Sequence, residues 1–578
     1  MKFFKNKIYG LLIAALVFAG CNEDSFLTEI NPNANNVSLF FSSENDYNSA
    51  LTTVYGALQF QAISGRNLIS EFALGDEGGT TAFARLAIQF KQLTYNDADE
   101  AIVNKWNELY IGISRANQVI KSIEIEDDAL FTRFDKNEIE AQARFLRAFF
   151  YFQLVHTYGG GVLRTDIIQN QEDLDKGFSS IQEITDAVIT PDLEYAMANL
   201  PKKWEGDDIG RITWGAAASL LGKSYLYNKN WPMAADMLGR VVNDPDATYQ
   251  LTADIADNFT HFNEFNSESI LEVNYSFDLS PGVGGTNVDD TPGGPGAESS
   301  GLATTLGKQG NGGFNQVLTS YYINELMEAD EVDETNPIND GNVKSKRMNS
   351  SIATRDGDGL WYLEDPAEIT PAFNFAGISA YPKKHSNWYH LAAEPAQARS
   401  GINFRHIRFA DVLLLYAEAI LENSGDFTTA INLIDRVRAR AGVVTLQQYM
   451  DDNAGQFPQL HISEQVTGAP RPLVTPSVET VMTHLRLVER PTELCYEGHR
   501  WKDLVRWGIV RQVFEDQRAQ EIWRIDNFNQ GAMIRGTAPL DLNIAPRIDY
   551  EDALRNYQSK IHDYWPIPNP ERQTNDEL

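Results

Sequence analysis

The sequence predicts a mostly α-helical protein that carries one large, irregular, loop-rich part. Apolar side chains recur at alternating spacings of three and four residues in several long segments, which is the pattern of one buried face on a helix. Between about residues 275 and 405 this periodicity stops, and glycine and proline crowd the first part of that stretch. Together the two observations predict a scaffold of tetratricopeptide-like helix pairs and a separate part made mainly of loops.

Residues 1–20 differ from the rest of the chain. Three lysines precede an apolar run over residues 8–18, and two small residues stand directly before Cys21. This order is typical of a secretory signal peptide, and the run is about half of the roughly 20 residues that a membrane-spanning helix needs. Cys21 in this position resembles the bacterial lipobox, so we expect it to become the fatty-acylated first residue of the mature protein. An ordinary signal peptide followed by a chance cysteine is the alternative.

Residues 21–40 are polar and rich in asparagine, and we expect them to form a lipidated tether. Residues 41–578 are predicted to form a single domain. The chain contains two cysteines, so acylation of Cys21 leaves only Cys495 and excludes an intramolecular disulfide. A chain of this length buries an ample core without one, and Cys495 is predicted to be a packed, unreactive thiol.

The first predicted helix pair covers about residues 101–157. Apolar side chains follow one face from Ile102 to Ile123, and a second face runs from Ile139 to Leu154. Glycines at positions 159–161 predict where the second helix ends. We expect the two apolar faces to pack against each other.

Two more pairs are predicted over about residues 213–242 and 407–442, the latter with an apolar face that begins at Ile407. Small side chains such as Ala217 and Ala417 lie where the helices must approach closely. Both pairs resemble tetratricopeptide hairpins, although their spacing is irregular. Antiparallel helix pairs in an ordinary globular α domain are the alternative interpretation.

The loop-rich part, about residues 275–405, contains aromatic residues that core periodicity does not explain. They are Trp361, Tyr362, Trp388 and Tyr389. Loops longer than about 15 residues in a compact domain are usually functional or disordered, so these rings predict a binding surface. Ordinary packing of each ring is the alternative, because tryptophan and tyrosine are commonly mostly buried.

The charge of the chain limits its ligands. Its formal net charge is −32, from 48 basic and 80 acidic residues, and no cluster of five or more lysines and arginines interrupts the acidic composition. Nucleic acid and anionic polymers are therefore disfavoured as ligands.

No motif assigns a catalytic residue, a metal or a cofactor. A phosphate-binding loop and paired zinc ligands are absent from the sequence, and turn-forming Asp-Gly pairs explain residues 356–359 without calcium. Among 80 acids some carboxylate pair can always be proposed for glycoside hydrolysis. Charged residues interleaved with tryptophans between Glu489 and Trp507 predict a structural ion-pair network.

Several segments match one known family in the same order along the chain. They are the acidic residues after Cys21, the stretch from Phe26 to Tyr55, Glu140–Ala148 with Tyr158–Gly160, Ile407–Gly442, Glu489–Leu504 and Trp565–Pro568. Together they resemble the SusD/RagB family, the surface nutrient-binding lipoproteins of Bacteroidetes. The resemblance implies one α-rich domain with four tetratricopeptide-like helix pairs. It also implies a protein that lies as a lid on a TonB-dependent outer-membrane barrel of the SusC type and delivers glycans, or in some cases peptides, to it.

We therefore predict a cell-surface glycan-binding lipoprotein without catalytic activity. Neutral sugars present apolar C–H faces, which flat aromatic rings suit. The predicted ligand-binding residues are Trp361, Tyr362, Trp388 and Tyr389, with Phe83 beside Gly78 and Gly79 as a weaker candidate. A peptide-binding lipoprotein on the same scaffold and a surface glycoside hydrolase are the alternatives.

Overall fold

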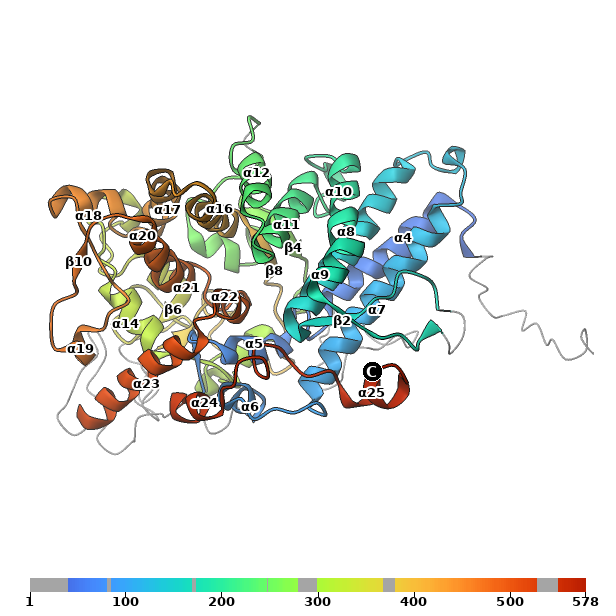
Figure 1. Cartoon of the computed structure of the whole chain (residues 1–578). Coiled ribbons are helices and arrows are strands. Elements are labelled where there is room, and N and C mark those ends of the chain that lie inside the picture. Colours follow the sequence, from blue (N-terminus) through green and yellow to red (C-terminus); the bar gives the residue numbers. More distant parts are fainter. Residues whose placement is uncertain are drawn as a thin grey trace, which may run out of the picture.

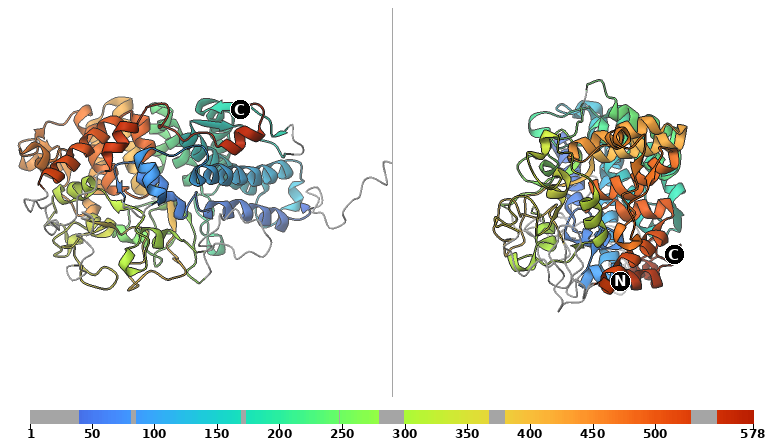
Figure 2. Two further views of the ribbon diagram at one scale, coloured as in Figure 1. Left: turned by 90° about the horizontal axis from the view of Figure 1, so that it is seen from below. Right: turned by 90° about the vertical axis from the view of Figure 1, so that its left-hand side faces the viewer.

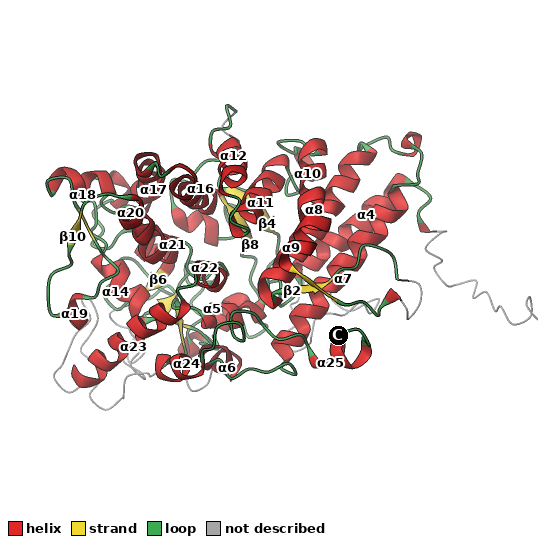
Figure 3. Ribbon diagram, in the orientation of Figure 1, coloured by secondary structure: helices red, strands yellow, loops and turns green. Residues whose placement is uncertain are grey.

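The computed structural model describes residues 40–80, 85–168, 173–246, 248–278, 299–366, 380–527 and 549–578. Over these residues helices dominate, and the short strands form only two-stranded sheets (Figures 1 and 3). The predicted mostly α-helical class is confirmed. None of the helices in these ranges is both long and apolar enough to cross a membrane.

The first helix pair is α7 (Glu100–Ile123) and α8 (Lys136–Tyr158), with α4 (Glu44–Gly56) packed beside both. Helix α8 begins at a capping box in which the Asp135 side chain accepts a hydrogen bond from the Asn137 amide in the first turn. It ends where Gly159 adopts the left-handed conformation (φ 77°) that glycine tolerates best. The predicted pair and its glycine stop are therefore confirmed.

The other helix pairs continue the scaffold side by side (Figure 1). Helix α8 packs against α10 (Thr190–Asn199), which packs against α11 (Trp214–Tyr227). Helix α11 pairs with α12 (Trp231–Val242), and α12 in turn lies against α16 (Phe409–Ser424), the partner of α17 (Phe427–Ala441). Each helix thus contacts the next along the chain, which is the arrangement expected of tetratricopeptide-like repeats.

One predicted boundary is wrong. Ile407 lies in strand β8 (Phe404–Arg408), which pairs antiparallel with β4 (Ser269–Val273), and the helix begins only at Phe409. Arg408 is still extended (φ −130°, ψ 160°). The apolar run continues unbroken from strand into helix, so the pattern alone could not locate the transition.

The loop-rich part forms a layer on one side of the molecule, coloured lime to yellow in Figure 2, away from the C-terminal helices in orange and red. It contains short helices that the sequence pattern did not reveal, among them α14 (Tyr321–Ala329), which starts where Ser320 caps the Ile323 amide. Its other elements are α13 (Leu302–Leu306), α15 (Lys346–Ser351), β5 (Leu318–Thr319), β6 (Ile352–Ala353) and β7 (Tyr381–Pro382).

The C-terminal segment returns across the molecule to the first helix pair. The Trp565 amide donates to the Thr157 carbonyl at 2.7 Å, and Trp106 of α7 donates to Glu571 at 3.3 Å. Its helices are α20 (Val478–His484), α21 (Arg490–Glu493), α22 (Arg500–Trp507), α23 (Val510–Asn527), α24 (Tyr550–Asn556) and α25 (Asn569–Thr574). The remaining α-helices and strands are α5 (Ile69–Leu74), α6 (Arg85–Gln92), α9 (Ile181–Ile184), α18 (Leu446–Asp452), α19 (Glu464–Thr467), β1 (Gly78–Gly79), β2 (Gly160–Val162), β3 (Phe178–Ser180), β9 (Phe457–Pro458) and β10 (Leu473–Val474).

Candidate functional site

A buried network of ion pairs connects α21 and α22 with the rest of the protein. The Glu493 carboxylate, which is fully buried, accepts from Arg408 at 2.8 Å, from Arg440 at 2.5 Å and from Arg347 at 3.1 Å. Further pairs join Arg438 to Glu489 and Asp330, Arg408 to Glu268 and Glu497, Arg490 to Asp411 and Asp503, and Arg500 to Asp76. The ion-pair network predicted between Glu489 and Trp507 is confirmed.

The electrostatics of this network assign it a structural role. Burial alone would raise the pKa of Glu497, but Arg408 and Lys384 outweigh that effect and lower it to about 2. Both oxygens of Glu497 are occupied by these two cations. Glu497 is thus held in its charged form and is already paired with two cations of the fold, as is typical of a structural ion-pair network.

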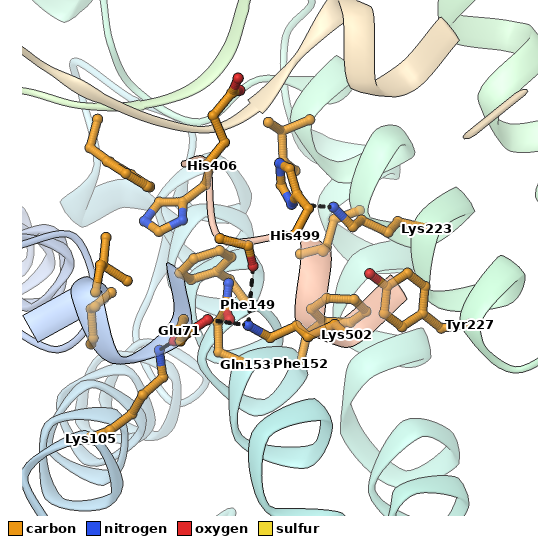
Figure 4. A pocket seen from close by; sticks show the side chains of 17 residues that line it. Glu71, Lys105, Phe149, Phe152, Gln153, Lys223, Tyr227, His406, His499 and Lys502 are labelled. Atoms are coloured by element: carbon orange, nitrogen blue, oxygen red, sulfur yellow. Dashed lines mark hydrogen bonds and ion pairs between the residues drawn. The ribbon is translucent and has the colours of Figure 1, made fainter. Parts of the chain in front are cut away.

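A small cavity lies next to this network (Figure 4). Lys105 and Lys502 both pair with Glu71, and Lys223 contacts His499. The cavity volume is about 30 Å³, whereas ligand pockets for small molecules measure roughly 300–1,000 Å³. The space suits one or two water molecules and excludes a sugar ring.

Two of the predicted ligand-binding rings are buried. Trp361 is 1% exposed and Tyr362 is fully buried, in a small second core with Leu318 and Tyr381. The Tyr362 hydroxyl donates to Glu394 at 2.9 Å, and its backbone has a left-handed φ of 51°, which is uncommon for a bulky residue. In this conformation neither ring offers a free face to a ligand.

The other two predicted rings, Trp388 and Tyr389, are partly exposed. The Lys383 ammonium lies 3.9 Å from the centre of the Trp388 ring. The Tyr389 hydroxyl accepts from the His261 amide at 2.9 Å and lies 2.5 Å from His261 Nδ1. Both contacts join the loop before β4, which carries His261, to the loop before β8, which carries Tyr389.

Tyr389, whose ring centre lies 5.8 Å from that of Trp388, also belongs to a group of five rings that we call the surface aromatic cluster. Its members are His261, Phe262, Phe277, Tyr389 and His390. Neighbouring ring centres lie between 4.1 Å (His261 to Phe262) and 6.4 Å (Phe277 to His390) apart. Phe262 is 68% exposed, and the other four are partly exposed. The cluster is an open aromatic surface on the loop-rich side of the protein.

Sequence reasoning found Tyr389 in this cluster but missed His261, Phe262 and Phe277. His261 and Phe262 lie before β4, outside the stretch of residues 275–405 that lacks periodicity. Phe277 lies just after β4, at the edge of that stretch. Phe262 lies in the otherwise polar sequence Thr260–Asn263. An isolated aromatic in such surroundings was the available signal.

Both histidines of the cluster are uncharged at neutral pH. Burial lowers the pKa of His390 to about 4, and the nearby His261 adds to this effect. Burial also lowers the pKa of His261. Neutral imidazoles provide one hydrogen-bond donor and one acceptor each, so the cluster combines apolar faces with a few polar atoms.

Other residues singled out in the sequence fall elsewhere. Phe83 and Cys21 lie outside the described residues. Asp358 accepts from the amides of Val343 and Lys344, and Asp356 pairs with Lys344 at 2.8 Å, so both carboxylates are occupied within the fold. Within the described ranges no group of three or more histidine, cysteine or acidic side chains could hold a metal ion.

Comparison with known proteins places this architecture in a family. A family model described as "SusD family" matches residues 267–578, more than half of the chain. The chain belongs to the SusD family. A second model, described as "Starch-binding associating with outer membrane", matches residues 26–226. The resemblance read from the ordered motifs is confirmed.

Individual SusD-like proteins match most of the chain. A SusD-like protein of Bacteroides ovatus is 26% identical over 480 residues, covering 79% of this chain and 80% of that protein. The crystal structure of a SusD superfamily protein from Bacteroides vulgatus is 25% identical, with a TM-score of 0.71, and covers 93% of this chain and 98% of that one. A structure named as a laminarin binding SusD-like protein is 22% identical with a TM-score of 0.65 over the same shares of the two chains, and it supports the fold alone.

Proposed function

We propose that this protein is a cell-surface lipoprotein that captures an oligosaccharide or polysaccharide and passes it to a TonB-dependent outer-membrane barrel of the SusC type, without catalysis. Membership of the SusD family and relatives named for laminarin binding and surface glycan binding support a carbohydrate ligand. The surface aromatic cluster is the observation that carries the proposal for this chain, because it supplies the binding surface.

The geometry of the cluster suits a sugar ring. The exposed Phe262 ring and the partly exposed Tyr389 ring are 5.7 Å apart and inclined at 72°, so together they form an angled apolar wall. A pyranose packs its C–H face on such a wall and keeps its hydroxyls in water. The neutral His261 and His390 imidazoles lie beside these rings and offer polar contacts to the hydroxyls.

Binding of a polysaccharide panel by the full acylated chain in detergent tests this proposal. We expect Phe262→Ala and Tyr389→Ala each to weaken glycan binding by about 1–3 kcal/mol, on the order of 5- to 150-fold. Phe178→Ala is the matched control, because Phe178 is 41% exposed but lies on β3, next to Gly160. Its binding should equal that of the wild type.

Three results would contradict the proposal. Binding that survives both cluster substitutions would remove the cluster from the site. Binding of extended peptides in place of glycans, lost in the same variants, would favour the peptide-binding alternative. Release of reducing ends from a bound polysaccharide would establish a hydrolase.

The barrel partner has a separate test. We expect a large barrel protein to co-purify with this chain from outer membranes solubilised in mild detergent. Recovery of the chain alone, under conditions that keep other outer-membrane assemblies intact, would contradict the transport role.

A further inference from the structure

The surface aromatic cluster ends at a cation. The Arg399 guanidinium lies 5.7 Å from the centre of the Phe277 ring, and that ring lies 6.4 Å from the His390 ring. Arg399 therefore extends the row of rings with a positive charge. An oligosaccharide that packs on the cluster and extends past His390 and Phe277 would bring its substituents toward this guanidinium.

Arg399 differs from the neighbouring arginines because it forms no ion pair with a carboxylate among the described residues. Its Nε is buried without a hydrogen-bond partner, and no carboxylate in the described ranges forms an ion pair with it. In the strand that follows, Arg405 pairs with Glu272 at 3.0 Å and Arg408 pairs with Glu268 at 2.7 Å. In a chain with 80 acidic and 48 basic residues, this partly buried arginine has no carboxylate partner among the residues that the structure describes.

The backbone that carries Arg399 is held firmly. The Arg399 carbonyl accepts from the Asn387 side chain at 3.2 Å. The next residue, Ser400, donates its amide to the Ser299 hydroxyl at 3.0 Å and accepts from the Ser300 amide at 2.8 Å. A cation on a fixed backbone loses less entropy on binding than one on a free loop.

The charges around Arg399 are consistent with an acidic ligand. The carboxylate of Glu394, on the same segment, is occupied by Asn387 and Tyr362. Asp278 is exposed, one residue beyond Phe277, and forms no ion pair with Arg399. Arg66 packs against Gly301, which also borders the Ala398 carbonyl, and it too has no carboxylate partner in the part of the chain that the structure describes. This end of the cluster thus differs from the strongly acidic chain as a whole.

We propose that the ligand of the surface aromatic cluster is an acidic oligosaccharide, carrying a carboxylate or a sulfate, and that Arg399 binds this group. The inference rests on the glycan-binding function proposed above and specifies its ligand. The planar guanidinium presents parallel N–H donors that match the two oxygens of a carboxylate or sulfate. The aromatic rings hold the sugar ring itself. The net charge of the chain disfavours long anionic polymers, but a short acidic oligosaccharide responds mainly to the charges within about 10 Å.

Matched oligosaccharide pairs test the inference: oligogalacturonate with its carboxyl-reduced form, and sulfated glycans with their desulfated forms, within a panel that also contains neutral glycans. We expect the full acylated chain in detergent to bind acidic members, and the affinity to fall as sodium chloride is raised. Arg399→Gln should lower that affinity about 10- to 100-fold, as loss of hydrogen bonds to a charged group does. Arg399→Lys should retain part of it.

Arg436→Gln is the matched control. Arg436 lies 5.5 Å from the centre of the Phe409 ring, in the same type of cation–π contact, and has no described carboxylate partner, but it belongs to α17 of the scaffold. Its affinity should equal that of the wild type. The thermal midpoints of both variants should also match the wild type, since neither side chain contributes an ion pair to the described fold.

The outcomes distinguish a failure of the acidic-ligand inference from a failure of the proposed glycan-binding function. If the neutral member of each pair binds as well as the acidic one, or if Arg399→Gln leaves affinity and salt dependence unchanged, the acidic-ligand inference is overturned while the glycan-binding function stands. If Arg399→Gln unfolds the protein, the acidic-ligand inference is decided by whether the wild type binds the acidic member of each pair more tightly than the neutral one. If no glycan of either kind binds, the proposed function fails and the inference fails with it.

Discussion

Glu493→Gln should destabilise the protein strongly, although it changes one atom of one side chain. Glu493 is fully buried and its carboxylate contacts Arg347, Arg408 and Arg440 at once. Glutamine keeps the shape of the side chain but removes the negative charge. It also replaces one acceptor oxygen with an N–H donor, which faces guanidinium donors that cannot accept.

The size of the effect follows from burial. Removing one partner of a buried ion pair costs about 3–5 kcal/mol, because the remaining charge stays buried without compensation. In the variant, Glu268, Glu489 and Glu497 still contact the same arginines, so these arginines keep part of their charge compensation. The cost of one unpaired charge is therefore not counted three times. We therefore expect about 3–5 kcal/mol in total and not three times that amount.

Asp166→Asn is the matched control. Asp166 pairs with Lys121 at 3.1 Å, but the two side chains are 68% and 36% exposed, so the expected loss is about 0–1 kcal/mol. Urea unfolding should be followed by tryptophan fluorescence and by far-UV circular dichroism, and the comparison holds where the two curves coincide. A Glu493→Gln protein within about 1 kcal/mol of the wild type, with an unchanged dependence on urea, would refute this reasoning.

Three further predictions concern the anchor, the buried rings and acid stability. Cys21→Ala should move the protein from the membrane fraction to the soluble fraction and abolish labelling with a fatty acid; unchanged partition and labelling would contradict the lipid anchor. Trp361→Ala should cost about 3–5 kcal/mol of stability, since the ring is 1% exposed, and it should leave the glycan affinity of the folded fraction unchanged. Lys105 and Lys502 overcome the opposing effect of burial and lower the pKa of Glu71 from 4.5 to about 2, and that of Glu497 falls equally. Because these pKa values are depressed, their stabilisation is present above pH 4.5 and is lost as the pH falls toward 2, so urea midpoints that stay constant between pH 5 and 2 would argue against it.

The helix pairs could be predicted from the sequence because their signals are local. The apolar face from Ile102 to Ile123 recurs at helical spacing and corresponds closely to α7. Gly159 marks the end of α8 because only the few residues around it decide whether the helix continues. The start of α16 was misplaced, because β8 forms only by pairing with β4, more than 100 residues earlier in the chain.

The binding surface could not be predicted in the same way, because exposure is a tertiary property. Trp361 lies in sequence without core periodicity, yet long-range contacts with Leu318 and Tyr381 bury it. Phe262 is 68% exposed, and its polar local sequence indicates an isolated aromatic residue but not which rings lie next to it. The surface aromatic cluster joins a segment just before the loop-rich part to residues near its two ends, so only the folded chain brings Phe262 next to Tyr389.

The scaffold network and the proposed ligand surface are linked through the sheet of β4 and β8. Glu268 stands directly before β4, and Arg408 ends β8; both pair with each other, and Arg408 also contacts Glu493. The loops that carry the cluster leave from the ends of these same two strands: Phe262 precedes β4 and Phe277 follows it, and Arg399 precedes β8. The network therefore fixes the ends of the two strands from which these loops depart. The ion pairs of Arg408 lie at the strand ends, and the proposed ligand-contacting rings lie in the loops beyond them. This arrangement predicts that weakening the network at Glu493 would reduce ligand affinity indirectly, by loosening the strands from which the cluster projects.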